Sequence, residues 1–498
     1  MKNKNYFYEM IPADEMARLQ YVPTIPQLLE KMKNEYSALP AVSDMTTTYT
    51  YAEFYERIGR RRTLINGLGL KKGAKIAVWD RNSVDAMELY LAITSAGYVT
   101  VMLPATLQEM QMLGSLKKFD VEAMFVREEF RPMCEKVQVK MLSTKEIADT
   151  FTPSAEAKKE DLASIFFTGG TTGMPKGVML SHGNMMRGAF NGMFMPSSVI
   201  GNQRYIAFLP FSHIFGIVRG LLACFFTGSL VYSCEDMKAG IGTLPRIKPT
   251  CLVLVPGLCE ILLGLTKMYG PQFLGGELKL IIAGAANVPP VLIKAFKDLN
   301  IRLLGGYGLT ESSNLVSGNA NVEEYPESVG QVYPEQEYKF VNGELWIKGD
   351  HVMMGYYNDP EATAATMEDG WLKTGDLVHE DENGYLYIDG RIKNIIVLKN
   401  GENVLPESIE EKFYMNQFVR DCLVKPTTIN GDEVIGIEIL PRMEMFKDAT
   451  PEMIQKTLQN VVDEVNKELP PFARVITMKV RTEDFKRTGS LKVDRRNS

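Results

Sequence analysis

The stretch from Ser164 to His182 reads SIFFTGGTTGMPKGVMLSH, and an abrupt change of residue type runs through it. The apolar residues 165–167 are followed at once by six glycines and threonines: Thr168, Gly169, Gly170, Thr171, Thr172 and Gly173. Glycine lets a backbone come close to an anion, and threonine hydroxyls and successive N–H groups supply hydrogen-bond donors. The stretch therefore predicts a buried strand that leads into a loop shaped for phosphate, with the basic Lys176 just beyond it.

This loop differs from a phosphate loop of the Walker A type. That motif requires Gly-Lys followed by Ser or Thr, whereas Pro175 precedes Lys176 here and Gly177 follows it. A plain Gly/Thr turn between a strand and a helix is the structural alternative, and the composition of the segment alone favours it. The choice between the two depends on the rest of the chain.

Further motifs follow along the chain. FTGGTTGMPKGV resembles the phosphate loop of the adenylate-forming enzymes, a superfamily of acyl- and aryl-CoA synthetases, peptide-synthetase adenylation domains and beetle luciferases. The resemblance continues in the family's order with FLPFSH at 208–213, AGAA at 283–286, GYGLTE at 306–311, WLKTGD at 371–376 and DGR at 389–391, and Lys492 lies near the end. Ordered motifs of this number form a strong signal, which a single Gly-rich loop would not.

The order of the elements predicts an α/β fold. Short apolar runs alternate with helical patterns through the first two thirds of the chain, which is typical of mainly parallel sheets with flanking helices. Expected strands include 205–209, and an expected helix covers 184–191. After about Pro326, signals such as Asn383-Gly384 predict hairpins and hence a β subdomain.

A second, smaller domain is expected at the C-terminus. Residues 391–498 have an α+β pattern of their own, with helices expected at 406–415 and 453–469 and strands at 434–440 and 475–480. About 105 residues can fold as a separate unit. We therefore expect an N-terminal domain at 1–390, which holds the ATP and acyl sites, and a mobile lid at 391–498, with the boundary at the family's hinge.

The resemblance implies a site for MgATP. Thr168 to Gly173 would hold the β- and γ-phosphates, and Lys176 would either contact phosphate or support the loop. Thr310 would contact the α-phosphate. Glu311 would be the Mg²⁺ ligand, since this metal usually takes one or two protein carboxylates together with phosphate oxygens. The metal set is thus Glu311 alone.

The resemblance also implies how the adenosine is held. Asp376 would accept both ribose hydroxyls, as one carboxylate can, and Arg391 would hold the same ribose or the phosphate. Tyr307 would pack on the adenine. The remaining residues expected around the base are the small ones of two motifs: Gly284, Ala285, Ala286, Gly306 and Gly308.

Three residues are implied in the acyl chemistry itself. In the family, the equivalent of His213 sits at the substrate carboxylate, and the equivalent of Lys492 reaches into the cleft during adenylation. Gly401 lies in a turn that would line the path of the CoA thiol. Two positions depart from the usual pattern: Gly169 stands where many members have Ser, and Leu491 stands where Gly usually precedes the lysine.

The bulk properties exclude several function classes. The 498 residues are 45% hydrophobic and 23% charged, which is ordinary for a globular protein, and the net charge of −6 gives a nucleic-acid role no support. Six Cys without a CxxC pair read as thiols in a reducing compartment, and the four His are scattered. The N-terminus lacks an apolar h-region, and the longest apolar run, 220–232, is too short to span a bilayer. We therefore expect a cytoplasmic protein, with a homodimer as one candidate assembly.

These observations predict an AMP-forming acid:CoA ligase. Its cosubstrates would be ATP and coenzyme A, and its metal would be Mg²⁺. The tail and the segment 394–404 resemble those of long-chain fatty acyl-CoA synthetases, so a fatty acid is the expected substrate. The alternatives are an aryl-acid:CoA ligase and a ligase that uses acyl-carrier protein as acceptor. An amino-acid adenylation domain is disfavoured, because residues 211–226 contain no Asp or Glu to bind an ammonium group. A catalytically inactive binding homologue is disfavoured by the full set of expected site residues.

Overall fold

The computed structural model describes residues 19–168, 176–193, 203–398, 401–429, 432–447, 449–486, 493 and 495. The largest sheet lies at the N-terminal end and has a parallel centre. Its strand order is β18 (Gly355–Tyr356), β8 (Lys176–Ser181), β7 (Leu162–Thr168), β4 (Val99–Leu103), β3 (Lys75–Trp79), β5 (Val121–Val126) and β6 (Lys140–Ser143). Strands β7 to β6 of this order run parallel, while β8 and β18 are antiparallel additions at one edge.

Amphipathic and buried helices cover this sheet. Helix α5 (Val84–Ser95) is buried along nearly its whole length, which suits its position between β3 and β4. The other helices of this region are α3 (Ile25–Tyr36), α4 (Tyr51–Asn66), α6 (Glu109–Lys118) and α7 (His182–Gly192). A small sheet of β2 (Thr48–Thr50), β1 (Pro40–Ser43), β10 (Leu230–Tyr232) and β9 (Arg204–Ile206) lies beside them.

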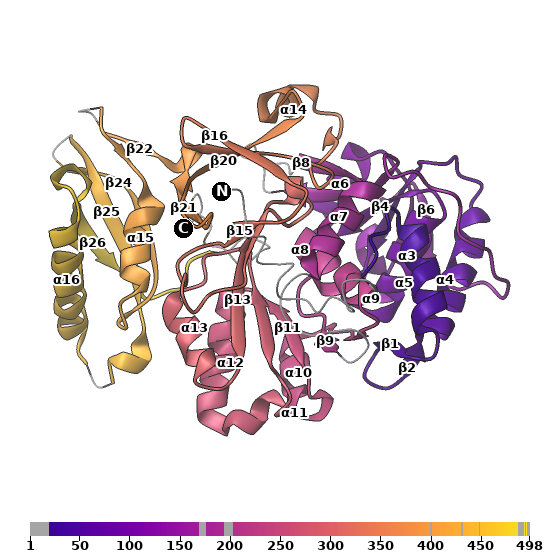
Figure 1. Cartoon of the computed structure of the whole chain (residues 1–498), viewed down its shortest axis with the longest axis horizontal. Helices are drawn as coiled ribbons and strands as arrows, with labels where there is room; N and C mark the ends of the chain where they lie inside the picture. The colour runs from indigo at the N-terminus through magenta and orange to yellow at the C-terminus, as the bar shows by residue number, and fades with distance from the viewer. Residues whose placement is uncertain are drawn as a thin grey trace.

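A second α/β layer follows. Its sheet orders β11 (Cys251–Leu254), β12 (Leu280–Ala283), β13 (Arg302–Tyr307), β14 (Ser317–Asn319) and β15 (Gln331–Val332), of which the first three are parallel. Figure 1 shows α12 (Pro256–Tyr269) and α13 (Pro290–Lys297) against this sheet. The short helices α8 (Ile214–Ile217), α9 (Ala223–Phe226), α10 (Met237–Gly242) and α11 (Leu244–Ile247) connect the two layers.

The expected β subdomain is present. It orders β16 (Glu337–Val341), β17 (Glu344–Lys348), β20 (Trp371–Glu380) and β19 (Met367–Glu368), and β21 (Leu386–Arg391) pairs with β20. Helix α14 (Pro360–Thr366) lies beside it, at the top of Figure 1. Residues of these sheets and of the N-terminal layers share one hydrophobic cluster.

The C-terminal part has a separate hydrophobic cluster, formed only by residues from 396 onwards. Its sheet orders β24 (Val419–Ile429), β25 (Asp432–Pro441) and β26 (Val475–Val480), and β22 (Ile396–Val397) pairs with β23 (Asn403–Val404). In Figure 1, α16 (Pro451–Glu468) covers the far face of this unit, and α15 (Pro406–Tyr414) lies on the side of β21. The predicted α/β class, with a large N-terminal domain and a small C-terminal one, is confirmed.

Three details differ from the sequence predictions. The Gly-rich segment joins two antiparallel strands, β7 and β8, instead of a strand and a helix, and the next described helix begins at His182. The strand expected at 205–209 ends at Ile206, because the carbonyls of Ala207 and Leu209 accept hydrogen bonds from a side chain instead of a neighbouring strand. Strand β24 was missed: its Pro426 is typical of non-strand segments, and it is tolerated here because β24 is an edge strand.

Within the described residues, no helix has both the length and the apolar character that crossing a membrane requires.

Candidate active site

The two ends of the Gly-rich loop are held together by the sheet. Thr168 at the end of β7 is the register partner of Lys176 at the start of β8, and both are half-buried. The loop residues Gly169, Gly170, Thr171, Thr172 and Gly173 lie outside the described residues. The structure therefore places the ends of the expected phosphate loop next to each other at one edge of the large sheet.

Glu311 lies beside these loop ends and is oriented by a tyrosine that sequence analysis missed. Tyr356 Oη donates a hydrogen bond to Glu311 Oε1 at 2.8 Å, and Lys176 Nζ lies 4.5 Å from the centroid of the Tyr356 ring. Burial, and then the charge of Glu311, raise the pKa of Tyr356, so this hydroxyl keeps its proton and donates throughout the neutral range. The contact leaves Glu311 Oε2 for another partner. Tyr356 reaches this position because β18 pairs with β8, a contact that no local pattern indicates.

Asp376 forms the second charged group of the site. It is 2% exposed and accepts hydrogen bonds from Tyr307 Oη at 2.5 Å, from Arg391 Nε at 2.5 Å and from Arg391 Nη2 at 3.2 Å. Burial, and then Asp376, raise the pKa of Tyr307. Burial alone would lower the pKa of Arg391, but Asp376 and smaller effects that include Glu311 outweigh it and raise that pKa. The expected ribose-binding pair is thus one network, within electrostatic range of Glu311.

The segments expected at adenine lie close to the helix that begins after His213. A Cβ on Gly284 would lie 3.1 Å from the ring of Phe215, so the absence of a side chain allows this approach. Ala285 has a φ of +66°, an unusual backbone conformation for a residue with a side chain. Ala286 is exposed. Strained backbone of this kind is common at functional sites.

The turn after β13 is equally crowded. A Cβ on Gly308 would lie 1.7 Å from the carbonyl oxygen of Asn314, so only glycine fits. This close approach folds the turn back on itself and places Thr310 and Glu311 in the short helix η4 (Thr310–Ser312), which lies against β7 and β8. Thr310 and Glu311 therefore come together with the loop ends, while Gly306 and Tyr307 lie in β13, where they pair with β14.

His213 caps the N-terminus of α8, where its Nδ1 accepts a hydrogen bond from Phe215 N at 3.3 Å. The segment that leads to it is held by Asn82. Asn82 Nδ2 donates to the carbonyls of Ala207 and Leu209, both at 2.7 Å, and Asn82 Oδ1 accepts from Phe211 N at 3.0 Å. Sequence analysis missed Asn82, because its partners lie more than 120 positions away.

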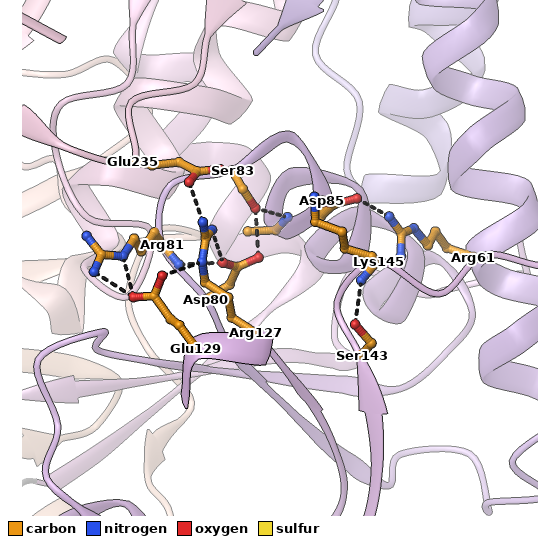
Figure 2. A network of polar contacts seen from close by, with 11 residues as sticks. Arg61, Asp80, Arg81, Ser83, Asp85, Arg127, Glu129, Ser143, Lys145 and Glu235 are labelled. Atoms are coloured by element: carbon orange, nitrogen blue, oxygen red, sulfur yellow. Dashed lines mark hydrogen bonds and ion pairs between the residues drawn. The ribbon is translucent and has the colours of Figure 1, made fainter. Parts of the chain in front are cut away.

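A polar network includes Asp80 and Ser83, which lie on either side of Asn82 in the sequence, and it links two sheets (Figure 2). Asp80, at the end of β3, accepts hydrogen bonds from Ser83 Oγ at 2.7 Å and from Arg127 Nη1 at 3.0 Å. Arg127, at the end of β5, also contacts Glu235 Oε2 at 2.5 Å, just beyond β10. Burial raises the pKa of Asp80, against the effects of Ser83 and Arg127. The network keeps the 80–83 turn in the place from which Asn82 holds the segment before His213.

Replacing Asn82 with alanine should therefore weaken acid binding indirectly, through the position of the segment that leads to His213. Each buried backbone group that loses its partner costs about 1–3 kcal/mol. We expect a lower Tm and a raised KM for the acid, with KM for ATP changed much less. Initial-rate kinetics with each substrate varied in turn will measure this.

The matched control for that variant is Asn321→Ala, which removes a surface amide bonded to Glu324. It should alter neither Tm nor KM. Equal changes of KM for acid and for ATP in Asn82→Ala would contradict the positioning role.

The C-terminal unit contacts the rest of the chain at two places near this site. Asn287 Nδ2, just after the Gly284 segment, donates to Glu411 Oε1 on α15 at 2.7 Å. A Cβ on Gly390 would lie 3.0 Å from the Leu405 side chain. Gly401 is exposed and has a φ of +83°, and no atom of the part of the chain that the structure describes lies within 4 Å of a Cβ placed on it.

Lys492 lies outside the described residues, but its neighbours are described. Val493 packs against a cluster of Leu423, Leu440 and Phe485. Arg495 forms ion pairs with Glu407 and Glu410 on α15 and donates to the Val424 carbonyl. The segment on either side of position 494 is thus attached to the C-terminal unit.

The donor set fits a magnesium ion that arrives with its phosphates. The described residues contain no group of three or more His, Cys, Asp or Glu that could hold a metal by itself. Glu311 instead offers a single carboxylate with one oxygen engaged by Tyr356. Mg²⁺ is usually bound through one or two carboxylates together with substrate phosphates and water.

Comparison with known proteins identifies the family. The AMP-binding enzyme family matches residues 29–357, and the AMP-binding enzyme C-terminal domain matches residues 393–498. A long-chain-fatty-acid–CoA ligase of Haemophilus influenzae is 31% identical over 301 residues, which are 56% of this chain and 53% of that protein. The 4-coumarate–CoA ligase-like protein 6 of Arabidopsis thaliana is 30% identical over 408 residues, which are 72% of this chain and 70% of that protein.

A solved structure shows the same fold. The o-succinylbenzoate coenzyme A synthetase MenE of Bacillus subtilis, in complex with ATP and magnesium ion, matches with a TM-score of 0.80 at 21% identity, over 94% of this chain and 98% of that one. The match of the family to well over half of the sequence agrees with the order of the motifs. The chain belongs to the AMP-binding enzyme family and is an AMP-forming acid–CoA ligase of that family.

Proposed function

We propose that this ligase activates a fatty acid. The carboxylate of the acid would attack the α-phosphate of ATP, which forms an acyl-adenylate and releases pyrophosphate, and the CoA thiol would then displace AMP. The observation that carries the proposal is the convergence of Lys176, Glu311, Asp376 and Arg391 from four separate elements. The resemblance of the tail and of the segment 394–404 to those of long-chain fatty acyl-CoA synthetases supports a fatty acid over an aryl acid.

The Tyr307–Asp376–Arg391 network is suited to hold the nucleoside. Two hydrogen bonds from Arg391 and one from Tyr307 fix the Asp376 carboxylate in one orientation. A carboxylate has about four acceptor sites, two on each oxygen. Oδ2 already accepts from Tyr307 and Arg391, whereas Oδ1 accepts from Arg391 alone and has one site left. We propose that a ribose hydroxyl binds at Oδ1, that the second replaces one of the present donors to Oδ2, and that Arg391 offsets the negative charge of the nearby phosphate.

Glu311, Thr310 and Lys176 are proposed to act around the triphosphate. When bound, Mg²⁺ neutralises phosphate charge there, and Glu311 Oε2 is the protein oxygen that would hold it. Lys176 lies over the Tyr356 ring, so its ammonium is placed by a cation–π contact at the end of the loop. This supports both roles considered for Lys176, because the same contact allows it to brace the loop and to face phosphate.

We propose His213 at the substrate carboxylate and the separate hydrophobic unit after residue 390 as the lid. The lid carries Lys492, which would act in adenylation, and Gly401, which would lie beside the thiol in the second step. The contact of Asn287 with Glu411 would break and re-form as the lid turns. The acceptor is proposed to be CoA, with acyl-carrier protein as the alternative. All six Cys are buried free thiols, which supports the proposed cytoplasmic location.

The test is a pyrophosphate-release screen over fatty, aryl and amino acids, with and without CoA. We expect release with fatty acids, AMP as the second nucleotide product, and a thioester only when CoA is present. Formation of ADP and phosphate would contradict the proposed chemistry. If a thioester forms only with acyl-carrier protein, the acceptor is that protein and not CoA.

The screen includes a sharper comparison between octanoate and 2-aminooctanoate. The helix after His213 has no carboxylate to pair with an ammonium group, and an unpaired buried charge costs several kcal/mol. We expect kcat/KM for the amino acid to be lower by about 10²-fold or more, since each 1.36 kcal/mol is a factor of ten. Similar kcat/KM values for the two acids would contradict the proposal.

A further inference from the structure

One charged side chain lies inside the apolar helix that begins beside His213. Residues 214–226 read IFGIVRGLLACFF, in which Arg219 is the only charged residue. The helix runs from α8 through the π-helical turn η2 (Val218–Leu222) into α9, and Arg219 lies in the π turn. Arg219 is 3% exposed. A π turn within an α-helix is often found at a functional site.

The surroundings of Arg219 are neutral. Helix α7 approaches it closely, since a Cβ on Gly192 would lie 3.0 Å from Arg219 Cδ and 3.4 Å from Leu315. Four titratable groups lie near enough to feel its charge. Burial raises the pKa of each of them, and the positive charge of Arg219 opposes that rise without cancelling it. These uncharged groups come from β9, α9, β11 and the segment after β15: Tyr205, Cys224, Cys251 and Tyr333.

Within the described part of the chain, no carboxylate forms an ion pair with Arg219, and its buried Nε has no hydrogen-bond partner. Arg61 shows the contrast, because it is equally buried but pairs with Asp85 and, at 3.0 Å, with Glu88. Residues 194–202, which follow α7 in the sequence, include no Asp or Glu. A buried cation without compensation is strongly unfavourable, so Arg219 calls for an anion that the described residues do not supply.

Other buried polar atoms without a described partner lie on the segments that flank Arg219. On α7 they are Nδ2 and Oδ1 of Asn191, the neighbour of Gly192. After η4 they are Ser313 Oγ and Asn314 Nδ2, next to Leu315. Buried polar groups are nearly always hydrogen-bonded, so this concentration indicates an interior region adapted to a polar ligand group.

We propose that Arg219 binds the second carboxylate of a dicarboxylic acid, so that the fatty acid of the proposed function carries a carboxylate at each end. This inference rests on that function. Arg219 lies six residues after His213, the residue that caps this helix, which corresponds to about 9 Å along the helix axis at 1.5 Å per residue. The reacting carboxylate is at the His213 end. At the other end the guanidinium offers paired N–H donors, whose geometry matches a carboxylate, and that second carboxylate stays chemically unchanged.

The first test uses the wild-type enzyme alone. Pyrophosphate release is measured with adipate, suberate and sebacate, with their monomethyl esters, and with hexanoate, octanoate and decanoate. We expect the best diacid to exceed its own monomethyl ester by about 10²-fold or more in kcat/KM, because the ester leaves the buried guanidinium without an anion. Equal turnover of diacid and ester, or turnover of the monoacids only, overturns the inference but leaves the proposed function standing. If none of the acids, of any class, gives pyrophosphate release, both the inference and the proposed function are overturned.

The second test uses Arg219→Met, with Arg204→Met as the control. Arg204 lies beside Tyr205 on β9 but is partly exposed and pairs with Glu277. Arg219→Met should lose about 10²-fold in kcat/KM on the diacid and keep or gain activity on the monoacid, whereas the control should change neither. Arg219→Lys should retain part of the diacid activity, because the charge remains and only the paired geometry is lost.

Thermal unfolding without substrate completes the test. Removing an uncompensated buried charge should leave the Tm of Arg219→Met equal to or above that of the wild type. A clearly lower Tm would show that Arg219 has a partner within the chain, and it would overturn the inference. Equal losses on diacid and monoacid would do the same, since they indicate a structural role.

Discussion

Asp376→Asn is expected to lower kcat/KM for ATP by about 10²-fold, the usual effect of losing one preorganised polar partner. The carboxylate of Asp376 accepts three hydrogen bonds from Tyr307 and Arg391 and is almost fully buried. An amide has one acceptor oxygen, and its NH₂ group would face donors. The ribose contacts and the orientation of Arg391 should both suffer. Initial-rate kinetics with ATP varied at saturating acid will measure the change.

The control is Asp389→Asn on the neighbouring strand β21. Asp389 pairs with His379 at 2.8 Å, but both side chains are exposed. This variant should keep kcat/KM within about twofold of the wild-type value and Tm within a few degrees of it, since surface ion pairs contribute at most about 1 kcal/mol. The proposed role of Asp376 is wrong if Asp376→Asn is folded and keeps its kcat/KM for ATP. Loss of kcat/KM for the acid alone would equally contradict it.

Lys492→Ala is expected to slow acyl-adenylate formation by about 10²–10³-fold, because it removes the cation that we propose stabilises charge at the α-phosphate. The same variant should still convert supplied acyl-adenylate to thioester, since in the proposed mechanism the lid turns Lys492 away before that step. Arg495 and Val493 attach the neighbouring residues to the lid. These contacts of the two neighbouring residues are consistent with the proposed role of Lys492 on the lid. Pyrophosphate exchange and single-turnover thioester formation measure the two steps separately.

Gly401→Leu is the complementary variant. Its side chain would project from the proposed lid, where the described residues place no atom within 4 Å of the new Cβ. It should obstruct the thiol step and spare adenylation. Lys467→Ala, which removes an exposed lysine of α16, should affect neither step. If Lys492→Ala and Gly401→Leu remain folded and lose both half-reactions in proportion, the rotating-lid mechanism does not apply to this enzyme.

Much of the fold can be predicted from short local sequence patterns. Helix α15 begins at the predicted residue 406 and ends within one residue of the predicted end, and α16 begins within two residues of the predicted start, because periodicity and helix start signals act over a few positions. The motif residues Tyr307, Asp376 and Arg391 belong to short patterns with a known chemical use, so they too can be found locally. The resemblance of these patterns to those of a known family is sufficient to indicate adenylation.

The sequence by itself therefore determined the class of fold, the family and the type of reaction. Only the tertiary structure decided which side chains orient the site. Tyr356 reaches Glu311 through the pairing of β18 with β8, and Asn82 reaches the segment before His213 across more than 120 positions. The sequence also could not show that no described carboxylate pairs with Arg219. Such contacts depend on how whole sheets and helices pack, and this packing is set by the sum of many distant apolar contacts that no short pattern encodes.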